Sequence, residues 1–116
     1  MTGPVRISAK AASVAADLEP EYIAFAPDSS QAFAVMQENN AVAVIDVSSA
    51  EVLSINGLGF KNYGIPGNEI DVSNRDGGVN IRSWDVFGTY MPDAVDAYSV
   101  NGALYLVTAN EGDGRE

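Results

Sequence analysis

The fold is decided by residues 21–55, which read EYIAFAPDSSQAFAVMQENNAVAVIDVSSAEVLSI. Four short apolar runs in this stretch are separated by turn-forming Pro, Asp, Ser and Asn. The runs predict β-strands at residues 21–26, 31–37, 41–47 and 51–55. Because only short turns separate these strands, we expect them to form one four-stranded antiparallel meander.

A second pair of strands is predicted near the end of the chain. Residues 93–100 and 103–109 are apolar runs joined by Asn101-Gly102, a dipeptide typical of two-residue hairpin turns. A shift of 72 residues places Pro20 on Pro92 and overlays the first hairpin on this one without a gap. The overlay predicts that the meander begins again at residue 92, as blades repeat in a β-propeller.

The segment between the two strand groups has a different composition. It is rich in glycine and mixes charged with aromatic residues, with no strand or helix period. We expect a long inserted loop, ordered by its aromatic residues. Trp84, Phe87 and Tyr90 are expected to pin this loop onto the blade by burying their rings.

These patterns predict an all-β protein of antiparallel four-stranded β-propeller blades, about one and a half of them, with a long inserted loop. Since a propeller needs about four to eight blades, the chain is expected to be part of a longer protein. A free-standing six-stranded sandwich is the alternative. The predicted divisions are a lead-in segment at 1–17, helical or extended, a first blade at 18–57, the loop at 58–91 and half of a second blade at 92–116.

Charge and composition restrict the function. Sixteen acidic against six basic residues give a net charge of −10, which argues against nucleic acid or an anionic membrane as a partner. Histidine and cysteine are absent, which removes Ser-His-Asp and Cys-His catalysis, Cys/His zinc sites and disulfides. The remaining oxygen ligands suit calcium or magnesium. No apolar run reaches the ~20 residues of a membrane span, so no direct membrane insertion is expected.

Six motifs along the chain resemble the choice-of-anchor I domain family. They are residues 18–23 (LEPEYI), 37–46 (QENNAVAVID), 71–77 (DVSNRDG), 80–84 (NIRSW), 90–93 (YMPD) and 108–113 (TANEGD). The resemblance implies a secreted or surface-attached bacterial β-propeller, similar in its blades to YVTN-type propellers, and an extracellular or cell-surface location. It also implies that the partners are the remaining blades of the same propeller and an extracellular ligand. Some members of the family carry an alkaline-phosphatase or phosphoesterase label.

The first candidate metal site lies in the inserted loop. Asp71, Ser73, Asn74 and Asp76 bring four oxygen-bearing side chains together just before a glycine. Short segments of this kind wrap a calcium ion in other proteins, although the spacing is not that of an EF-hand. The alternative is that these residues form ordinary turns. Arg75 and Arg82 flank the segment and are expected to pair with its carboxylates.

The second candidate metal site combines two strand ends. Glu38 follows the second predicted strand, and Asn110, Glu111 and Asp113 follow the equivalent strand of the second blade. Equivalent positions on neighbouring blades lie on one face of a propeller, so these groups could converge on an ion. The alternative is that they cap strand ends.

We therefore expect a non-catalytic binding or scaffold module of an extracellular bacterial β-propeller protein, with calcium as a possible ligand. The alternative is part of a metal-dependent alkaline phosphatase or phosphodiesterase. Serine and threonine hydroxyls are present, but the chain has no histidine or cysteine that could activate one of them as a nucleophile. Hydrolysis would therefore require a water molecule activated by a bound metal ion.

Overall fold

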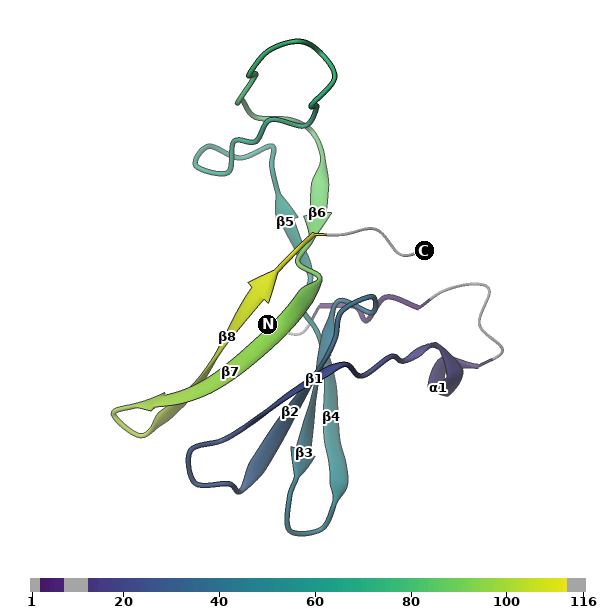
Figure 1. Ribbon diagram of the computed structural model, residues 1–116, viewed down its shortest axis with the longest axis vertical. Coiled ribbons are helices and arrows are strands. Elements are labelled where there is room, and N and C mark those ends of the chain that lie inside the picture. Colours follow the sequence, from purple (N-terminus) through teal and green to yellow (C-terminus); the bar gives the residue numbers. More distant parts are fainter. Residues whose placement is uncertain (1–2, 8–12, 113–116) are drawn as a thin grey trace.

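The computed structural model describes residues 3–7 and 13–112 (Figure 1). Nearly all regular structure in it is β, as expected, and the strands pair antiparallel in three sheets. Its elements are α1 Val14–Asp17, β1 Tyr22–Phe25, β2 Gln31–Met36, β3 Ala41–Asp46, β4 Glu51–Gly57, β5 Phe60–Asn62, β6 Phe87–Thr89, β7 Pro92–Val100 and β8 Ala103–Asn110. No described helix has the length and apolar character needed to cross a membrane.

The first four strands form one sheet in the order β1-β2-β3-β4, which confirms the predicted meander. Asp28 and Asp46 lie at two of its turns, where each carboxylate accepts a backbone N–H two or three residues ahead. A bulge opposite Val44 and Ile45 bends β4. The end of β4 is covered by the lead-in segment, since Gly3 N–H donates to Gly57 C=O at 2.7 Å.

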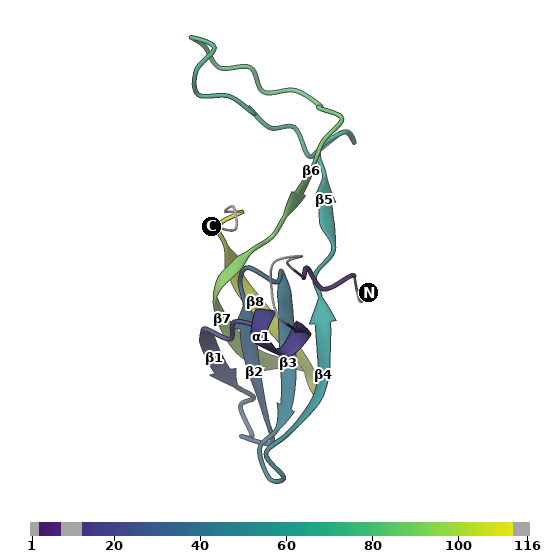
Figure 2. The same ribbon diagram turned by 90° about the vertical axis from the view of Figure 1, so that its right-hand side faces the viewer.

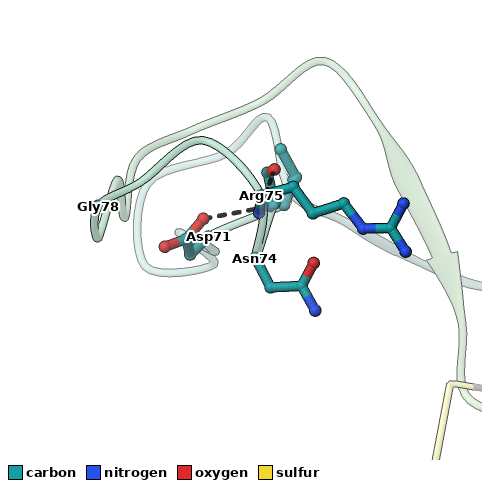
Figure 3. Close-up of a pocket in the computed structure, with 6 residues that line it drawn as sticks. Asp71, Asn74, Arg75 and Gly78 are labelled. Atoms are coloured by element: carbon teal, nitrogen blue, oxygen red, sulfur yellow. Dashed lines mark hydrogen bonds between the residues drawn. The ribbon is translucent and has the colours of Figure 1, made fainter.

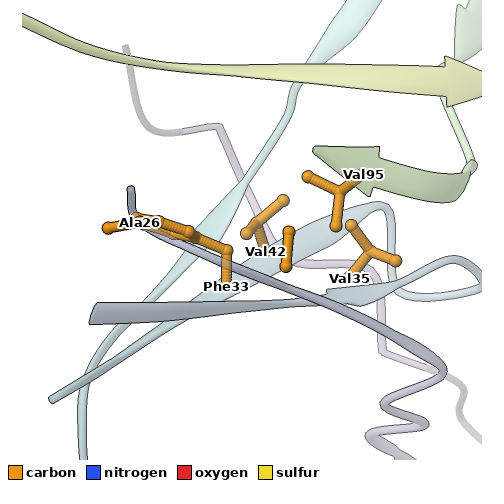
Figure 4. Close-up of a cluster of buried hydrophobic side chains, with 6 residues drawn as sticks. Ala26, Phe33, Val35, Val42 and Val95 are labelled. Atoms are coloured by element: carbon orange, nitrogen blue, oxygen red, sulfur yellow. The ribbon is translucent and has the colours of Figure 1, made fainter. Parts of the chain in front are cut away.

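The two faces of this sheet have different neighbours. Phe33, Val35 and Val42 are buried on one face, where Val95 of β7 packs against them (Figure 4). Ala34, Met36 and the alanines of β3 point to the other face, against Val5 and Leu18 of the lead-in segment. The core therefore lies mainly between the four-stranded sheet and β7.

The second hairpin is confirmed, with β7 and β8 joined by Asn101-Gly102. Both turn residues have positive φ, 50° and 80°, as a type I′ turn requires. The ungapped overlay of the two hairpins is wrong in its pairing. Tyr22 pairs with Val35, whereas Ala94 pairs with Ala109 and not with Val107. The physical reason is the turn, because the first hairpin needs a longer loop than the two-residue turn of the second.

The inserted segment is an arm and not a plain loop. β5 and β6 pair antiparallel at its base, and Ile70 pairs with Arg82 further out, so the prediction of a loop without strands is wrong there. Figures 1 and 2 show the arm projecting away from the sheets. Phe87 is 63% exposed, so it does not pin the arm to the sheet as expected. The arm is held by its own backbone ladder, which satisfies its polar groups without burial.

The helix α1 shows that the end of the lead-in segment is helical. Ser13 caps its first turn, where the Ser13 Oγ accepts the Ala16 N–H at 3.2 Å. Residues 8–12, the rest of the stretch that could be helical or extended, lie outside the described residues. The described sheets are open, and they do not close into a propeller or a barrel.

Candidate functional site

The strand-end motif at residues 37–40 forms a buried polar junction. Asn40 is 1% exposed, and its Nδ2 donates to the Gly59 carbonyl at 2.7 Å. Its Oδ1 accepts the backbone N–H groups of Tyr90 and Met91 at 2.9 and 3.1 Å. One amide therefore joins the end of β2 to both ends of the arm.

Asn39 makes the matching connections on the other side of the sheet. Its Nδ2 donates to the Arg6 carbonyl at 2.9 Å and to Asp17 Oδ2 at 3.0 Å. Its Oδ1 accepts the Glu19 N–H at 3.1 Å. Both asparagines use their donor and acceptor groups on the fold, so neither amide is available to a ligand. The sequence leaves two roles open for these amides, as polar groups of the second candidate site beside Glu38 or as turn residues. The positive φ of Asn40, 49°, fits a turn, but the burial of both residues follows only from tertiary contacts.

The second candidate metal site is only partly assembled. Gln37 Nε2 donates to Glu111 Oε2 at 2.9 Å, so the two strand ends do meet. Glu38 is half-buried in the turn after β2, and the Asn110 Oδ1 accepts the Thr108 hydroxyl at 2.9 Å. Asp113 lies outside the described residues. The strand ends therefore form a hydrogen-bonded contact between the sheets.

A pocket opens beside this contact, at the base of the arm. Asn110, Glu111 and Gly112 line one side of it, and Thr89 and Tyr90 line the other together with Lys61 and Tyr63. The Lys61 ammonium lies 5.2 Å from the centre of the Tyr63 ring, within range of a cation–π contact. The pocket thus presents one cation, one carboxylate and two phenol rings, which suits a small polar ligand.

The first candidate metal site lies at the tip of the arm (Figure 3). Asp71, Ser73 and Asn74 line one open pocket with Arg75 and Gly78, while Asp76 is not among its lining residues. Asp71 Oδ1 accepts the Ser73 N–H at 3.1 Å, and Oδ2 accepts the Asn80 N–H at 3.0 Å. The N–H of Asn80 and then that of Ser73 lower the pKa of the Asp71 carboxyl.

These hydrogen bonds define the role of Asp71 at the tip of the arm. Among the described residues, no three acidic side chains gather closely enough to hold a metal ion. Asp71 already closes the loop by spanning residues 73 and 80. Asp71 therefore has a turn-forming role, and calcium at Asp71, Ser73, Asn74 and Asp76 stays a prediction, because that prediction involves only two carboxylates.

The two arginines of the arm differ from expectation. The Arg82 guanidinium carbon lies 3.3 Å from the centre of the Trp84 ring, so this side chain stacks on an indole and does not serve chiefly as a carboxylate partner. Trp84 Nε1 donates to the Ile70 carbonyl at 2.9 Å. Arg75 is exposed at the pocket rim. Trp84 therefore orders the arm internally and does not attach it to the sheets.

Together these features define an all-β protein of stacked antiparallel sheets with a projecting arm. The choice-of-anchor I domain model matches residues 2–116, and the chain belongs to the choice-of-anchor I domain family, as the motifs predict. It is also similar to a mesenchyme-specific cell surface glycoprotein of Strongylocentrotus purpuratus, with 42% identity over 57 residues. That match covers 47% of this chain and 7% of the glycoprotein, so the chain spans a small part of its relative. No solved structure matches the chain significantly.

Proposed function

We propose that this chain is a non-catalytic binding or scaffold module of a cell-surface protein, and that its sheets are blades of a β-propeller. The observation that carries the proposal is the packing of β7 face to face on β1 and β2, with Val95 buried against Phe33 and Val35. Consecutive propeller blades pack their sheets in this way.

Both outer faces of this stack are apolar. On the four-stranded sheet, the lead-in segment covers Ala34, Met36 and the alanines of β3, but Ile23 and Phe25 of β1 on the same face are 53% and 56% exposed. On the other sheet, Tyr98 and Tyr105 stack at 5.5 Å on the side away from the core. Soluble monomers rarely leave such surfaces open at both ends, so further sheets of the same protein are the occupants that we propose.

The surface location is supported by the family and by the relative. The family name refers to a choice of anchors, and the relative is a cell surface glycoprotein. An acidic chain without cysteine or histidine suits binding through shape, amide and carboxylate groups. An extracellular ligand is accordingly proposed, and the pocket at the base of the arm is its proposed place.

The alternative, part of a metal-dependent hydrolase, has no observation in its favour. Such a site needs several carboxylates or histidines around one ion, and the described residues provide no such group. Calcium at Asp71, Ser73, Asn74 and Asp76 stays a prediction, to be decided by titration.

Antibody labelling of cells tests the proposed location. An antibody raised against the purified chain is expected to label intact cells of the producing organism, and mild protease treatment of those cells should remove the label. A cytoplasmic protein of the same cells is the control for leakage. Labelling that requires permeabilised cells would contradict the proposal.

A further inference from the structure

Two asparagines of the chain are followed directly by glycine, at Asn56-Gly57 and Asn101-Gly102. An asparagine in this position has an unusually reactive side-chain amide, because glycine has no Cβ to shield its own backbone nitrogen from the amide carbon. The nitrogen reaches that carbon only when the backbone between the two residues is free to rotate. Since the two pairs have the same chemistry, their surroundings decide which of them reacts.

Asn56-Gly57 is held by partners on both of its sides. Asn56 pairs with Val42 in the ladder between β3 and β4, and its Nδ2 donates to the Ser54 Oγ at 2.9 Å. Gly57 is buried, and it pairs on its other edge with Gly3 of the lead-in segment. The backbone at this pair can therefore rotate only if the sheet opens locally.

Asn101-Gly102 has no such partners. Both residues are exposed and form the two-residue turn between β7 and β8, with φ of 50° and 80°. Within the part of the chain that the structure describes, neither the Asn101 side chain nor the Gly102 N–H makes a hydrogen bond. Open space surrounds the position that a Cβ of Gly102 would occupy. Since pairing begins only at Val100 and Ala103, the turn can change its backbone angles without the opening of a sheet.

We propose that Asn101 is a site of spontaneous covalent modification, with water as the co-reactant. The Gly102 nitrogen gives its proton to a solvent base and bonds to the Asn101 Cγ. The Cγ–Nδ2 bond then breaks, and Nδ2 takes up a proton and leaves as ammonia, so that a cyclic succinimide remains. One water molecule opens this ring at either of its carbonyl groups, which gives aspartate or isoaspartate at position 101. The net reaction consumes one water and releases one ammonia, and it needs no oxidant.

The reaction changes the length and the charge of the turn. In isoaspartate the main chain runs through Cβ and Cγ, which adds one carbon atom to the backbone of a turn that has only two residues. Val100 and Ala103 then lose the spacing that a two-residue turn gives them. Either product also adds a carboxylate to a chain whose net charge is already −10.

The turn lies where the two hairpins meet. Ser99 and Gly102 line one pocket together with Pro27 and Asp28 of the turn between β1 and β2. A new carboxylate here repels that of Asp28. This contact is at the opposite end of β7 from the junction at Asn40, so the modification loosens the second hairpin at the end that the junction does not hold. The proposal does not depend on the function proposed above.

Incubation of the purified 116-residue chain at mildly alkaline pH, followed by peptide mass mapping, tests the proposal. In the folded protein, Asn101 is expected to convert about tenfold or more faster than Asn56, because only Asn56 lies in a ladder that must open first. In urea the two asparagines should convert at similar rates, since each is followed by glycine. The unfolded chain is thus a matched control for the chemistry, and the difference between the two states measures the effect of the fold.

Asn101→Gly provides a second control, because glycine accepts the positive φ of the turn and has no side-chain amide. After incubation, the thermal midpoint of the wild type should be lower than that of fresh protein, while the midpoint of Asn101→Gly should stay unchanged. The proposal is overturned if Asn101 stays intact in the folded chain or converts no faster than Asn56. An equal fall in midpoint for both proteins would contradict the effect on the hairpin.

Discussion

Asn40 and Met91 lie 51 positions apart in the chain, and the Asn40 Oδ1 accepts the Met91 backbone N–H at 3.1 Å. Met91 is fully buried and has a positive φ of 51°, so the chain turns sharply here as it leaves the arm and enters β7. The same amide holds the start of the arm through Gly59. This buried amide therefore contributes to the relative position of the two larger sheets, together with the packing of Val95 and the Gln37–Glu111 hydrogen bond.

Replacing Asn40 is expected to destabilise the fold. Asn40→Ala removes the partner of three backbone groups and puts alanine, which tolerates the left-handed region less well than asparagine, at a φ of 49°. The change should cost about 2–4 kcal/mol in the free energy of unfolding. Urea unfolding followed by circular dichroism measures this. Asn74→Ala, at an exposed position of the arm, is the control and should change the value by less than about 0.5 kcal/mol. Equal effects would contradict the role of Asn40 as a junction.

Two phenylalanines on neighbouring strands test which face of the sheet is the core. Phe33 is 4% exposed and Phe25 is 56% exposed, on opposite faces. Phe33→Ala should cost about 3–5 kcal/mol, while Phe25→Ala should cost less than about 1 kcal/mol. Urea midpoints of the two variants provide the comparison. A large loss in Phe25→Ala would mean that its face is already covered.

Turn carboxylates should make the stability depend on pH. The Ser48 hydroxyl and then the Ser49 N–H lower the pKa of Asp46, and the Ser30 N–H lowers that of Asp28. Because the pKa is lowered in the folded protein, the unfolded chain takes up protons first as pH falls. Stability is then present above the ordinary value of 3.8 and is lost below it.

The Asp28→Asn, Asp46→Asn double variant checks this. Its thermal midpoint should decline less than that of the wild type as pH falls below that value, since its turns no longer titrate. Asp76→Asn, with one carboxylate removed from the arm, serves as a charge control. Parallel curves for wild type and double variant would show that these turns do not contribute.

Calcium binding at the arm has a built-in reporter. Trp84 is the only tryptophan, and its Nε1 donates to the carbonyl of Ile70, next to Asp71. If an ion binds at Asp71, Ser73, Asn74 and Asp76, its Kd should be on the order of 10⁻⁴ to 10⁻³ M, and the Trp84 emission should change with the same midpoint. Calorimetry and fluorescence on wild type and on the Asp71→Asn, Asp76→Asn double variant measure both. Equal heats from both proteins, or none, would leave Asp71 as a turn residue.

The strands of the meander and of the second hairpin, and their order, could be read from the sequence because they depend on local patterns. Apolar runs of the meander, Asp28 and Asp46 at its turns and Asn101-Gly102 in the hairpin each act within a few residues. The family could be recognised for the same reason, since its motifs are local and keep their order along the chain.

Only the tertiary structure decided the roles of the polar and aromatic residues. Asn39 and Asn40 become a buried junction because backbone groups from residues 6 to 91 converge on them. Trp84 orders the arm internally because the Ile70 carbonyl and Arg82 lie within its reach there. The sequence overlay predicted the register of the second hairpin incorrectly because turn length, and not composition, determines which residues pair. Local sequence determines where the strands of the two larger sheets form. Long-range contacts determine which polar groups form hydrogen bonds within the fold and which remain available to a partner.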